Sequence, residues 1–331
     1  MTARAQRITS TWRQPGTDRA LIWLAGTLVL VILITNLLSA YLRLHEAGLG
    51  CTPWPDCYGH IVPSEGAAAP GLQTALLPHE QIKQAHRILA GGLVLMVLVV
   101  LHQRTRLGLQ GGERTLPYAL AAVMLALAVV GPASYLKTMP AIATANILGG
   151  LVLLALTWRL LLASRRPQQV PVADSIRKLA LVSAGVVVIQ SASGAWTSAN
   201  FAGVACGDWF VCEAPPGRAS AVSAFNYFRE LELDGIGRVV VGAEAWLIQH
   251  VHRLAAWVTA LVLLMLALGL WRQGLRRHGA ALAMLVVLQL AVGLAGAAAG
   301  LPLLIVLAHN LLAAGLIVML IEINYRVAAH D

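Results

Sequence analysis

Charged residues are scarce in this sequence. Only 12% of its 331 residues are Asp, Glu, Lys or Arg, whereas 58% are hydrophobic. Soluble domains carry about 25% charged residues, so the composition excludes an ordinary soluble domain and indicates an integral membrane protein. The net charge of +9 does not indicate nucleic-acid binding, because the basic residues gather between apolar runs, as membrane topology requires.

Long apolar runs occupy the rest of the sequence. A chain in lipid must satisfy its own backbone hydrogen bonds, and about 20 apolar residues cross the hydrocarbon layer as a helix. We therefore predict an all-α polytopic membrane protein. Glycine-proline pairs at Gly131-Pro132 and around Gly300 predict tight turns after the third and seventh spans. The eight expected spans are 20–42, 81–103, 116–136, 141–163, 177–197, 246–271, 280–299 and 303–325.

Basic residues predict the orientation of these spans. Most of the 24 Lys and Arg residues lie before the first span or in every second connection. Cytoplasmic segments carry such an excess, so both chain ends are expected in the cytoplasm. The two long connections, at about residues 43–80 and 198–245, then face outward.

Cysteine is rare, and its placement is informative. The 4 cysteines are Cys51 and Cys57 in the first outward loop, and Cys206 and Cys212 in the second. Compartments outside the cytoplasm are oxidising, so we expect a Cys51–Cys57 and a Cys206–Cys212 disulfide. Each bond either stiffens its loop or exchanges with a partner thiol; the sequence leaves both open.

Histidines in two apolar runs share a sequence phrase. Gln84-Ala85-His86-Arg87 opens the second span, and Gln249-His250-Val251-His252-Arg253 opens the sixth. An imidazole inside a lipid-spanning helix is costly unless it is used, so the two copies predict two related sites. Together with the matching cysteine spacings, they divide the chain into four-helix halves at 1–163 and 164–331, in the same orientation.

Depth in the membrane relates three of the histidines. At 1.5 Å per residue, His86, His252 and His309 all lie roughly 8–9 Å below the outer surface, and Asn146 lies at the same level. His252 and His309 can thus offer two nitrogens to one flat cofactor. The apolar runs lack the third and fourth ligands that zinc takes, whereas haem supplies the other four nitrogens itself.

Neighbouring residues allow this interpretation and also plainer ones. Small residues such as Ala255 and Ala313 leave room for a macrocycle, and Arg87 and Arg253 can pair with the carboxylates of a porphyrin. Alternatively, an intramembrane histidine forms hydrogen bonds or relays protons, and small residues only pack helices together. His250, on another helix face, is expected at the membrane interface.

Taken together, these features resemble one family, the haem A synthases of bacterial and mitochondrial inner membranes. The resemblance covers nearly the whole chain and implies an oxidoreductase acting on a CH group. Such an enzyme converts a methyl substituent of haem O to the formyl group of haem A, for cytochrome oxidase. Besides the His-Arg phrases, the motifs that carry the resemblance are Glu46-Ala47-Gly48-Leu49-Gly50-Cys51-Thr52-Pro53-Trp54-Pro55-Asp56-Cys57-Tyr58-Gly59, Asn146-Ile147-Leu148-Gly149-Gly150 and His309-Asn310-Leu311-Leu312-Ala313-Ala314.

The resemblance also implies roles and partners. His252 and His309 would ligate the iron of a prosthetic haem b in the C-terminal half. His86 would ligate the iron of the substrate, haem O, in the N-terminal half. The partners would be haem O synthase and an electron donor in the bilayer of the bacterial inner membrane, and no nucleic acid is expected.

Two positions depart from the family. Asn146 stands where a second histidine is common, and Lys83 stands where a glutamate is common, three residues before His86. Glu80 or Glu46 is then left to supply a carboxylate to the substrate site. An iron with one open position suits a substrate that turns over. A non-catalytic b-type haem electron carrier, or a haem-handling membrane protein, remains the alternative.

Overall fold

Helices make up the regular structure of the chain. The computed structural model describes residues 19–47, 59, 79–107, 109–206 and 219–328. Eight of its helices are long and apolar enough to cross a membrane, which confirms the predicted all-α polytopic fold. These helices are α1 (Arg19–Glu46), α2 (His79–His102), α3 (Leu116–Val130), α4 (Pro140–Arg165), α5 (Asp174–Ala199), α7 (Ala243–Arg272), α8 (Arg276–Ala298) and α9 (Leu303–Arg326). The shorter elements are η2 (Arg104–Leu107), η3 (Gly111–Thr115), η4 (Pro132–Tyr135), η5 (Ala202–Val204) and α6 (Ala221–Ala224).

Glycine and proline end the spans at the predicted turns. Helix α3 stops at Val130, and Pro132 opens η4 after the intervening Gly131. A helix usually ends at or before the residue that precedes a proline, so α3 is shorter than the predicted span 116–136. Between α8 and α9, Gly300 and Leu301 have φ angles of 71° and 56°, and this left-handed backbone reverses the chain.

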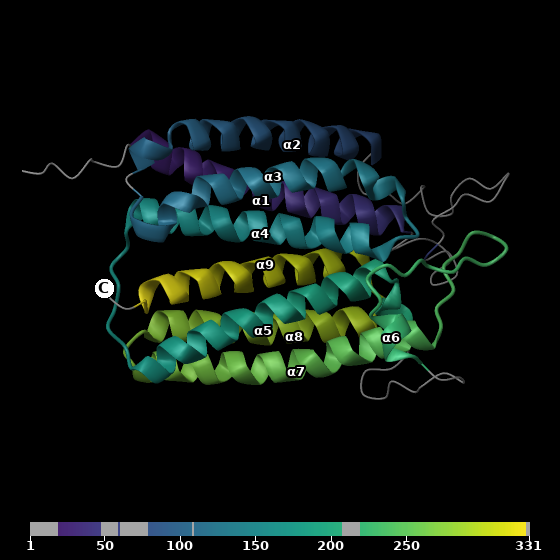
Figure 1. The fold of residues 1–331 in the computed structure, drawn as a ribbon. Coiled ribbons are helices and arrows are strands. Elements are labelled where there is room, and N and C mark those ends of the chain that lie inside the picture. Colours follow the sequence, from purple (N-terminus) through teal and green to yellow (C-terminus); the bar gives the residue numbers. More distant parts are fainter. Residues whose placement is uncertain (1–18, 48–58, 60–78, 108, 207–218, 329–331) are drawn as a thin grey trace, which may run out of the picture.

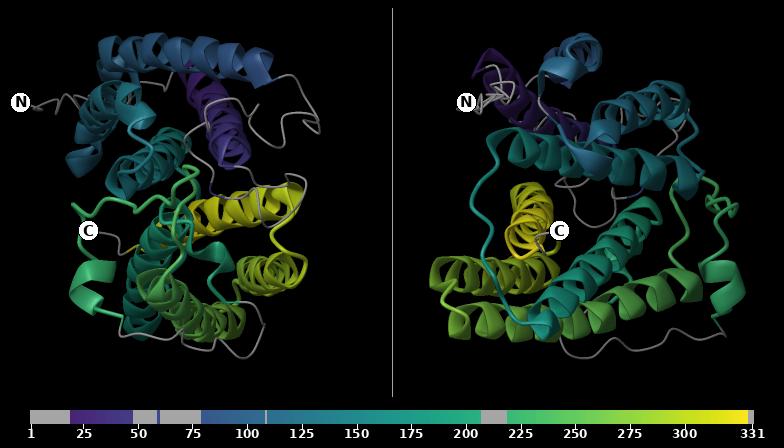
Figure 2. Two further views of the ribbon diagram at one scale, coloured as in Figure 1. Left: turned by 90° about the vertical axis from the view of Figure 1, so that its right-hand side faces the viewer. Right: turned by 60° about the vertical axis from the view of Figure 1, so that its left-hand side comes forward.

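The spans pack as two rings of four helices. Extensive contacts link α1 to α2, α2 to α3, α3 to α4 and α4 to α1, and likewise α5 to α7, α7 to α8, α8 to α9 and α9 to α5. In the described chain no extensive contact joins α2 to α4 or α7 to α9, so these pairs face each other across the diagonal of their rings (Figure 1, Figure 2). This arrangement is consistent with two copies of one four-helix unit.

A separate apolar cluster fills each ring. In the first, Leu28, Leu93, Leu120 and Leu154 come from four different helices and are at most 3% exposed. The second contains residues from α5, α7, α8 and α9, such as Leu263. Lipid tails are as apolar as leucine, so close packing rather than removal from water holds such helices together.

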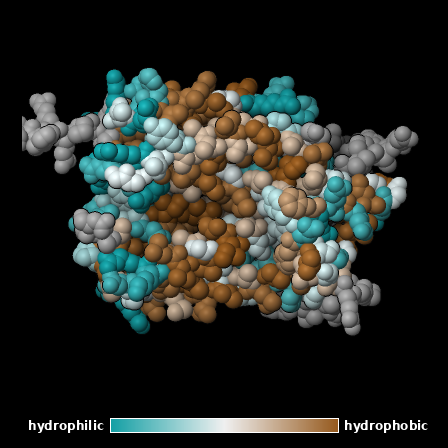
Figure 3. Space-filling view, viewed as in Figure 1, coloured by the Kyte–Doolittle hydropathy of each residue, from teal (hydrophilic) through white to brown (hydrophobic). Residues whose placement is uncertain are grey.

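The molecular surface fits a lipid bilayer. A band of hydrophobic residues covers the middle of the molecule, and hydrophilic residues gather at the two ends (Figure 3). Large apolar side chains such as Leu125, Leu181 and Leu261 are more than 60% exposed on the long helices. In water such a surface would drive association, whereas in lipid it is the expected outer face of a span.

The two rings contact each other through α1, α4, α5 and α9. Ala314 of α9 lies within the apolar cluster of the first ring. Polar contacts add to this packing: Arg43 Nη1 donates to Ser198 Oγ at 2.6 Å, and the Arg159 guanidinium lies 4.5 Å from the centroid of the Tyr325 ring. The rings therefore form one body.

A hairpin before α7 reaches across to the first ring. Leu233 and Val239 form an antiparallel bridge. The Leu231 N–H donates to the carbonyl of Thr138 at 2.8 Å, and the Val239 N–H donates to the carbonyl of Gly59 at 3.0 Å. The connection between α5 and α7 of the second ring is thus fastened to the end of the first ring at which α2 and α4 begin.

Candidate functional site

His252 lies within the first three turns of α7 and faces α5. Its Nδ1 atom is 3.1 Å from Gln190 Nε2 and 3.2 Å from Ser193 Oγ. The same glutamine amide donates to the backbone carbonyl of His252 at 3.2 Å. One face of α5 therefore contacts this histidine twice, at Nδ1 of its ring and at its backbone carbonyl.

Gly194 on α5 leaves room for the imidazole of His252. A Cβ atom added at Gly194 would come within 3.1 Å of His252 Cε1. That separation is tighter than an ordinary carbon contact of about 3.5–4.0 Å. A residue with a side chain at this position would push the imidazole away from Gln190 and Ser193.

His309 occupies a matching position near the start of α9, and it faces α8. Its Nε2 atom is 3.2 Å from Gln289 Nε2. A Cβ atom added at Gly293 would come within 3.0 Å of His309 Cε1. His252 and His309 of the second ring thus each pack against a glutamine and a glycine of a neighbouring helix.

The two histidines are suited to a haem iron. They sit on α7 and α9, the diagonal pair of the ring. His309 Nδ1 is buried, and no hydrogen-bond partner for it is found among the described residues. A buried polar atom without a partner costs about 1–3 kcal/mol, unless a ligand takes it. Haem iron takes two axial nitrogens, so these residues fit it.

The described ranges contain no group of three or more His, Cys, Asp and Glu residues that could hold a metal ion. The two arginines that follow His86 and His252 in the sequence have different surroundings. Arg253 donates to the Cys206 carbonyl at 3.4 Å, whereas Arg87 is exposed on α2. The pairing of these arginines with porphyrin carboxylates stays a prediction.

The first ring presents a sparser set of groups. His86 on α2 and Asn146 on α4 are half-buried and belong to the diagonal pair of their ring. Lys83 is half-buried, about 60° around the helix from His86, and Glu80 is exposed and about 120° around it at 100° per residue. Glu46 ends α1. In the described part of the chain the structure shows no hydrogen bond or ion pair among these residues, so their roles stay predictions.

Two further sequence predictions concern residues near the helix starts. His250 stacks on Trp246 with ring centroids 5.1 Å apart, an arrangement suited to the predicted interfacial role. Cys206 is buried and is not a free thiol. Cys51, Cys57 and Cys212 lie outside the described residues, so both disulfide pairings stay predictions.

Sequence reasoning missed Gln190, Ser193 and Gln289 as contacts of the histidines. A signal was present, because each is a polar residue inside an apolar run, where an unused polar side chain is costly. Both glutamines also have a glycine four residues later, at Gly194 and Gly293. Only the packing of α5 on α7 and of α8 on α9 shows which groups these residues meet.

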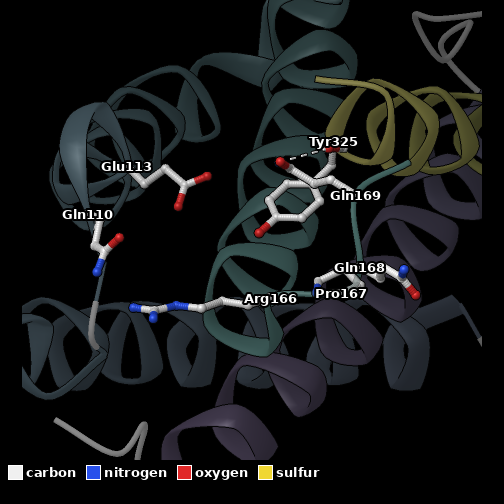
Figure 4. A pocket seen from close by; sticks show the side chains of 7 residues that line it. All are labelled: Gln110, Glu113, Arg166, Pro167, Gln168, Gln169 and Tyr325. Carbon is white, nitrogen blue, oxygen red and sulfur yellow. Dashed lines mark hydrogen bonds between the residues drawn. The ribbon is translucent and has the colours of Figure 1, made fainter. Parts of the chain in front are cut away.

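The described part of the chain has two cavities, and neither is lined by His252 or His309. One of about 530 Å³ lies at the opposite end of the molecule and is lined by polar residues of η3, of the segment after α4 and of α9, among them Glu113, Arg166 and Tyr325 (Figure 4). The Gln169 amide donates to the Tyr325 carbonyl there, at 3.3 Å. The other, of about 280 Å³, is apolar and lies between α1, α2 and α9, where it includes Tyr41 and Ala308.

Fold and site together define a class: a polytopic helical membrane protein whose second bundle carries two imidazoles suited to one haem. A family model described as "Cytochrome oxidase assembly protein" matches residues 21–321. Over 320 residues the chain is 32% identical to the haem A synthase of Shewanella oneidensis. The aligned region covers 92% of this chain and 96% of that protein. The chain therefore belongs to the cytochrome oxidase assembly protein family, which confirms the resemblance expected from its sequence.

Proposed function

We propose that this protein is a haem A synthase, which oxidises a methyl substituent of haem O to the formyl group of haem A for cytochrome oxidase. The reaction class is that of an oxidoreductase acting on a CH group. The observation that carries the proposal is the pair His252 and His309 on diagonal helices, in a chain 32% identical to a haem A synthase along 92% of its length.

The second ring would hold a resident haem b. His252 and His309 are its proposed axial ligands, because each is fixed by a neighbouring helix and His309 Nδ1 is buried without a described partner. When bound, a b-type haem supplies one-electron transfer. Arg253 would neutralise a carboxylate tail of this group. The residues 164–331 then form the electron-transfer half.

The first ring would hold the substrate. His86 is the proposed ligand of the haem O iron, and residues 1–163 form the substrate half. Asn146 lies on α4, the helix diagonal to α2, and would leave one position on that iron open. Four charged residues lie where α1 ends and α2 begins, and they would contact the polar edge of the substrate. They are Glu46, Glu80, Lys83 and Arg87.

Membrane placement follows from the charge distribution. The spans would cross a bacterial inner membrane with both termini in the cytoplasm and with the loops before α2 and α7 outside, because basic residues favour the cytoplasmic side. Haem O synthase would deliver the substrate within the same bilayer. An electron donor of that membrane would complete the partners.

Pigment analysis tests the proposal directly. The chain is expressed in a host that makes haem O but no haem A, together with His86→Ala and His309→Ala variants, and the extracted haems are separated. We expect haem A with the unaltered protein and only haem O with either variant. The purified His309→Ala variant should also lack the low-spin haem b spectrum. Haem O left unchanged by a folded, haem b-containing protein would refute the proposed activity.

A further inference from the structure

We propose that Gln190 and Gln289 are positioning residues that set the ring orientation of the two haem-ligating histidines and thereby tune the iron. The inference rests on the proposed function, since it takes His252 and His309 as the ligands of a haem b. Each glutamine acts together with a glycine one helical turn further on, Gly194 or Gly293. We call each glutamine–glycine pair a cradle.

The two cradles share one geometry although they lie on different helices. Residues four apart lie on the same helix face, so Gln190 and Gly194 of α5 present one surface to α7, and Gln289 and Gly293 of α8 present one to α9. In each case the amide reaches a ring nitrogen, at 3.1 Å and 3.2 Å. In each case the missing side chain makes room for Cε1.

The buried amide groups of the two glutamines can form hydrogen bonds with the histidine rings. The Oε1 atoms of Gln190 and Gln289 are buried, and no partner for either is found in the described part of the chain. The two ends of a glutamine amide are assigned from the hydrogen-bond network rather than observed, so each amide can donate to a ring nitrogen or accept from a ring N–H. Such a contact fixes the tautomer of a ligating histidine and its basicity.

The cradles differ in the nitrogen that they hold. Gln190 and Ser193 contact Nδ1 of His252, whereas Gln289 contacts Nε2 of His309. No counterpart of Ser193 contacts His309 in the described part of the chain. With these contacts kept, His252 would offer Nε2 to the iron and His309 would offer Nδ1, so the two glutamines should affect the haem separately.

The first ring serves as an internal comparison. Helix α1 neighbours α2 and α4 as α5 neighbours α7 and α9, but its amide side chain does not reach a histidine. Asn36 Nδ2 donates to the Gly150 carbonyl of α4 at 3.0 Å. No hydrogen bond to the His86 ring is found among the described residues. The cradles thus belong to the ring proposed to keep its haem, and not to the ring proposed to exchange it.

Spectroscopy of the haem-loaded, full-length protein tests the glutamines. Gln190→Leu and Gln289→Leu keep the side-chain size but remove the hydrogen bond. We expect altered g-values of the low-spin haem b, a displaced midpoint potential and haem loss to an apoprotein acceptor that is roughly tenfold faster. Gln273→Leu, at an exposed position just after α7, is the control and should leave all three unchanged.

Conservative variants separate positioning from packing. Gln190→Glu and Gln289→Glu keep an acceptor at the same place, which should preserve the low-spin spectrum and slow haem loss while lowering the potential, since a carboxylate raises ligand basicity. Gly194→Ala and Gly293→Ala should reproduce the leucine variants by displacing the ring. Gly185→Ala, on α5 with open space around its Cβ, should not.

The outcomes are distinct. Leucine variants with wild-type g-values, potential and haem retention overturn the inference, and so does a leucine defect that glutamate fails to reverse, since that indicates packing alone. In both cases the proposed function stands if the unaltered protein contains low-spin haem b. An unaltered protein without that haem would remove the proposed ligand pair itself.

Discussion

At the scale of single residues, some buried polar atoms have a specific partner in the described part of the chain and others have none. Trp196 Nε1 donates to the Ala224 carbonyl at 3.0 Å, and the Asn324 amide donates to the carbonyl of Ala180 at 3.1 Å. Nδ1 of His309 is among the atoms without a described hydrogen-bond partner, as are Thr144 Oγ1 and Ser183 Oγ, and the Gln289 backbone also interacts with the His309 ring. The free Nδ1 therefore supports a ligand at His309 only together with the second histidine on the diagonal helix α7.

One half-buried carboxylate organises the hairpin before α7. Asp234 Oδ1 accepts from the N–H groups of Arg238 at 2.8 Å and Ile236 at 3.1 Å, and Oδ2 accepts from Arg238 Nε at 3.1 Å. These bonds, led by that of the Arg238 N–H, lower the pKa of Asp234. The ionised form therefore favours the folded hairpin.

This pKa predicts how the hairpin responds to acid. Because the folded pKa is lowered, the stabilisation is fully present above the unfolded value of about 3.9 and is lost as pH falls through the folded value. Protection of the 234–240 amides against hydrogen exchange, corrected for intrinsic rates, should be constant from neutral pH down to about pH 5 and should fall only in stronger acid. In Asp234→Ala the protection should be low throughout; equal protection in both proteins would contradict the assignment.

At the scale of elements, small residues let neighbouring helices approach. Gly150 of α4 faces α1, and a Cβ atom added there would come within 2.5 Å of Asn36 Oδ1. The same asparagine donates to the Gly150 carbonyl. Interfaces between membrane helices are typically built from such small residues with a polar cross-link, so this contact should fix the register of α1 against α4.

We expect Gly150→Ala to destabilise the protein. The methyl group displaces the Asn36 amide, a change of roughly 1–3 kcal/mol, partly offset by about 0.5–1 kcal/mol from the better helix propensity of alanine. Thermal unfolding in detergent measures the difference. Gly26→Ala, on α1 with nothing near its Cβ, should be neutral or stabilising. In an Asn36→Ala background the Gly150→Ala penalty should disappear, and its persistence would show that the amide is not its cause.

At the scale of the whole molecule, the two rings are fastened at both ends. At the end where α2, α4, α7 and α9 begin, the hairpin of residues 231–240 reaches Gly59 and Thr138. At the other end, Arg159 of α4 lies over the Tyr325 ring of α9 and forms a 2.7 Å ion pair with Glu113 of η3. Contacts at both ends limit how far the two rings can move relative to each other.

Tyr325 offers a test of this second fastening. Tyr325→Leu removes the aromatic face under the Arg159 guanidinium, which is worth about 0.5–2 kcal/mol, so the unfolding temperature in detergent should fall. Tyr325→Phe keeps the ring and should stay close to the unaltered protein. If phenylalanine lowers the unfolding temperature as much as leucine does, the hydroxyl rather than the cation–π contact holds the rings together.

The sequence by itself determined the class of fold and the positions of the spans. Apolar runs of sufficient length must be helical in lipid, and Gly131-Pro132 and Gly300 marked turns that are present in the structure. The histidines His86, His252 and His309 could be selected because an imidazole in lipid is costly. The family motifs could also be recognised from the sequence, because each is a short continuous stretch of residues.

Only the tertiary structure decided which residues surround those histidines. Gln190, Ser193 and Gln289 lie far from their histidines in the chain, and their roles depend on which helix packs against which and on the rotation of each helix about its axis. Those variables come from side-chain packing between spans, which hydropathy does not encode. Tertiary packing also made α7 and α9 a diagonal pair, so that two imidazoles can share one ligand while their helices remain apart.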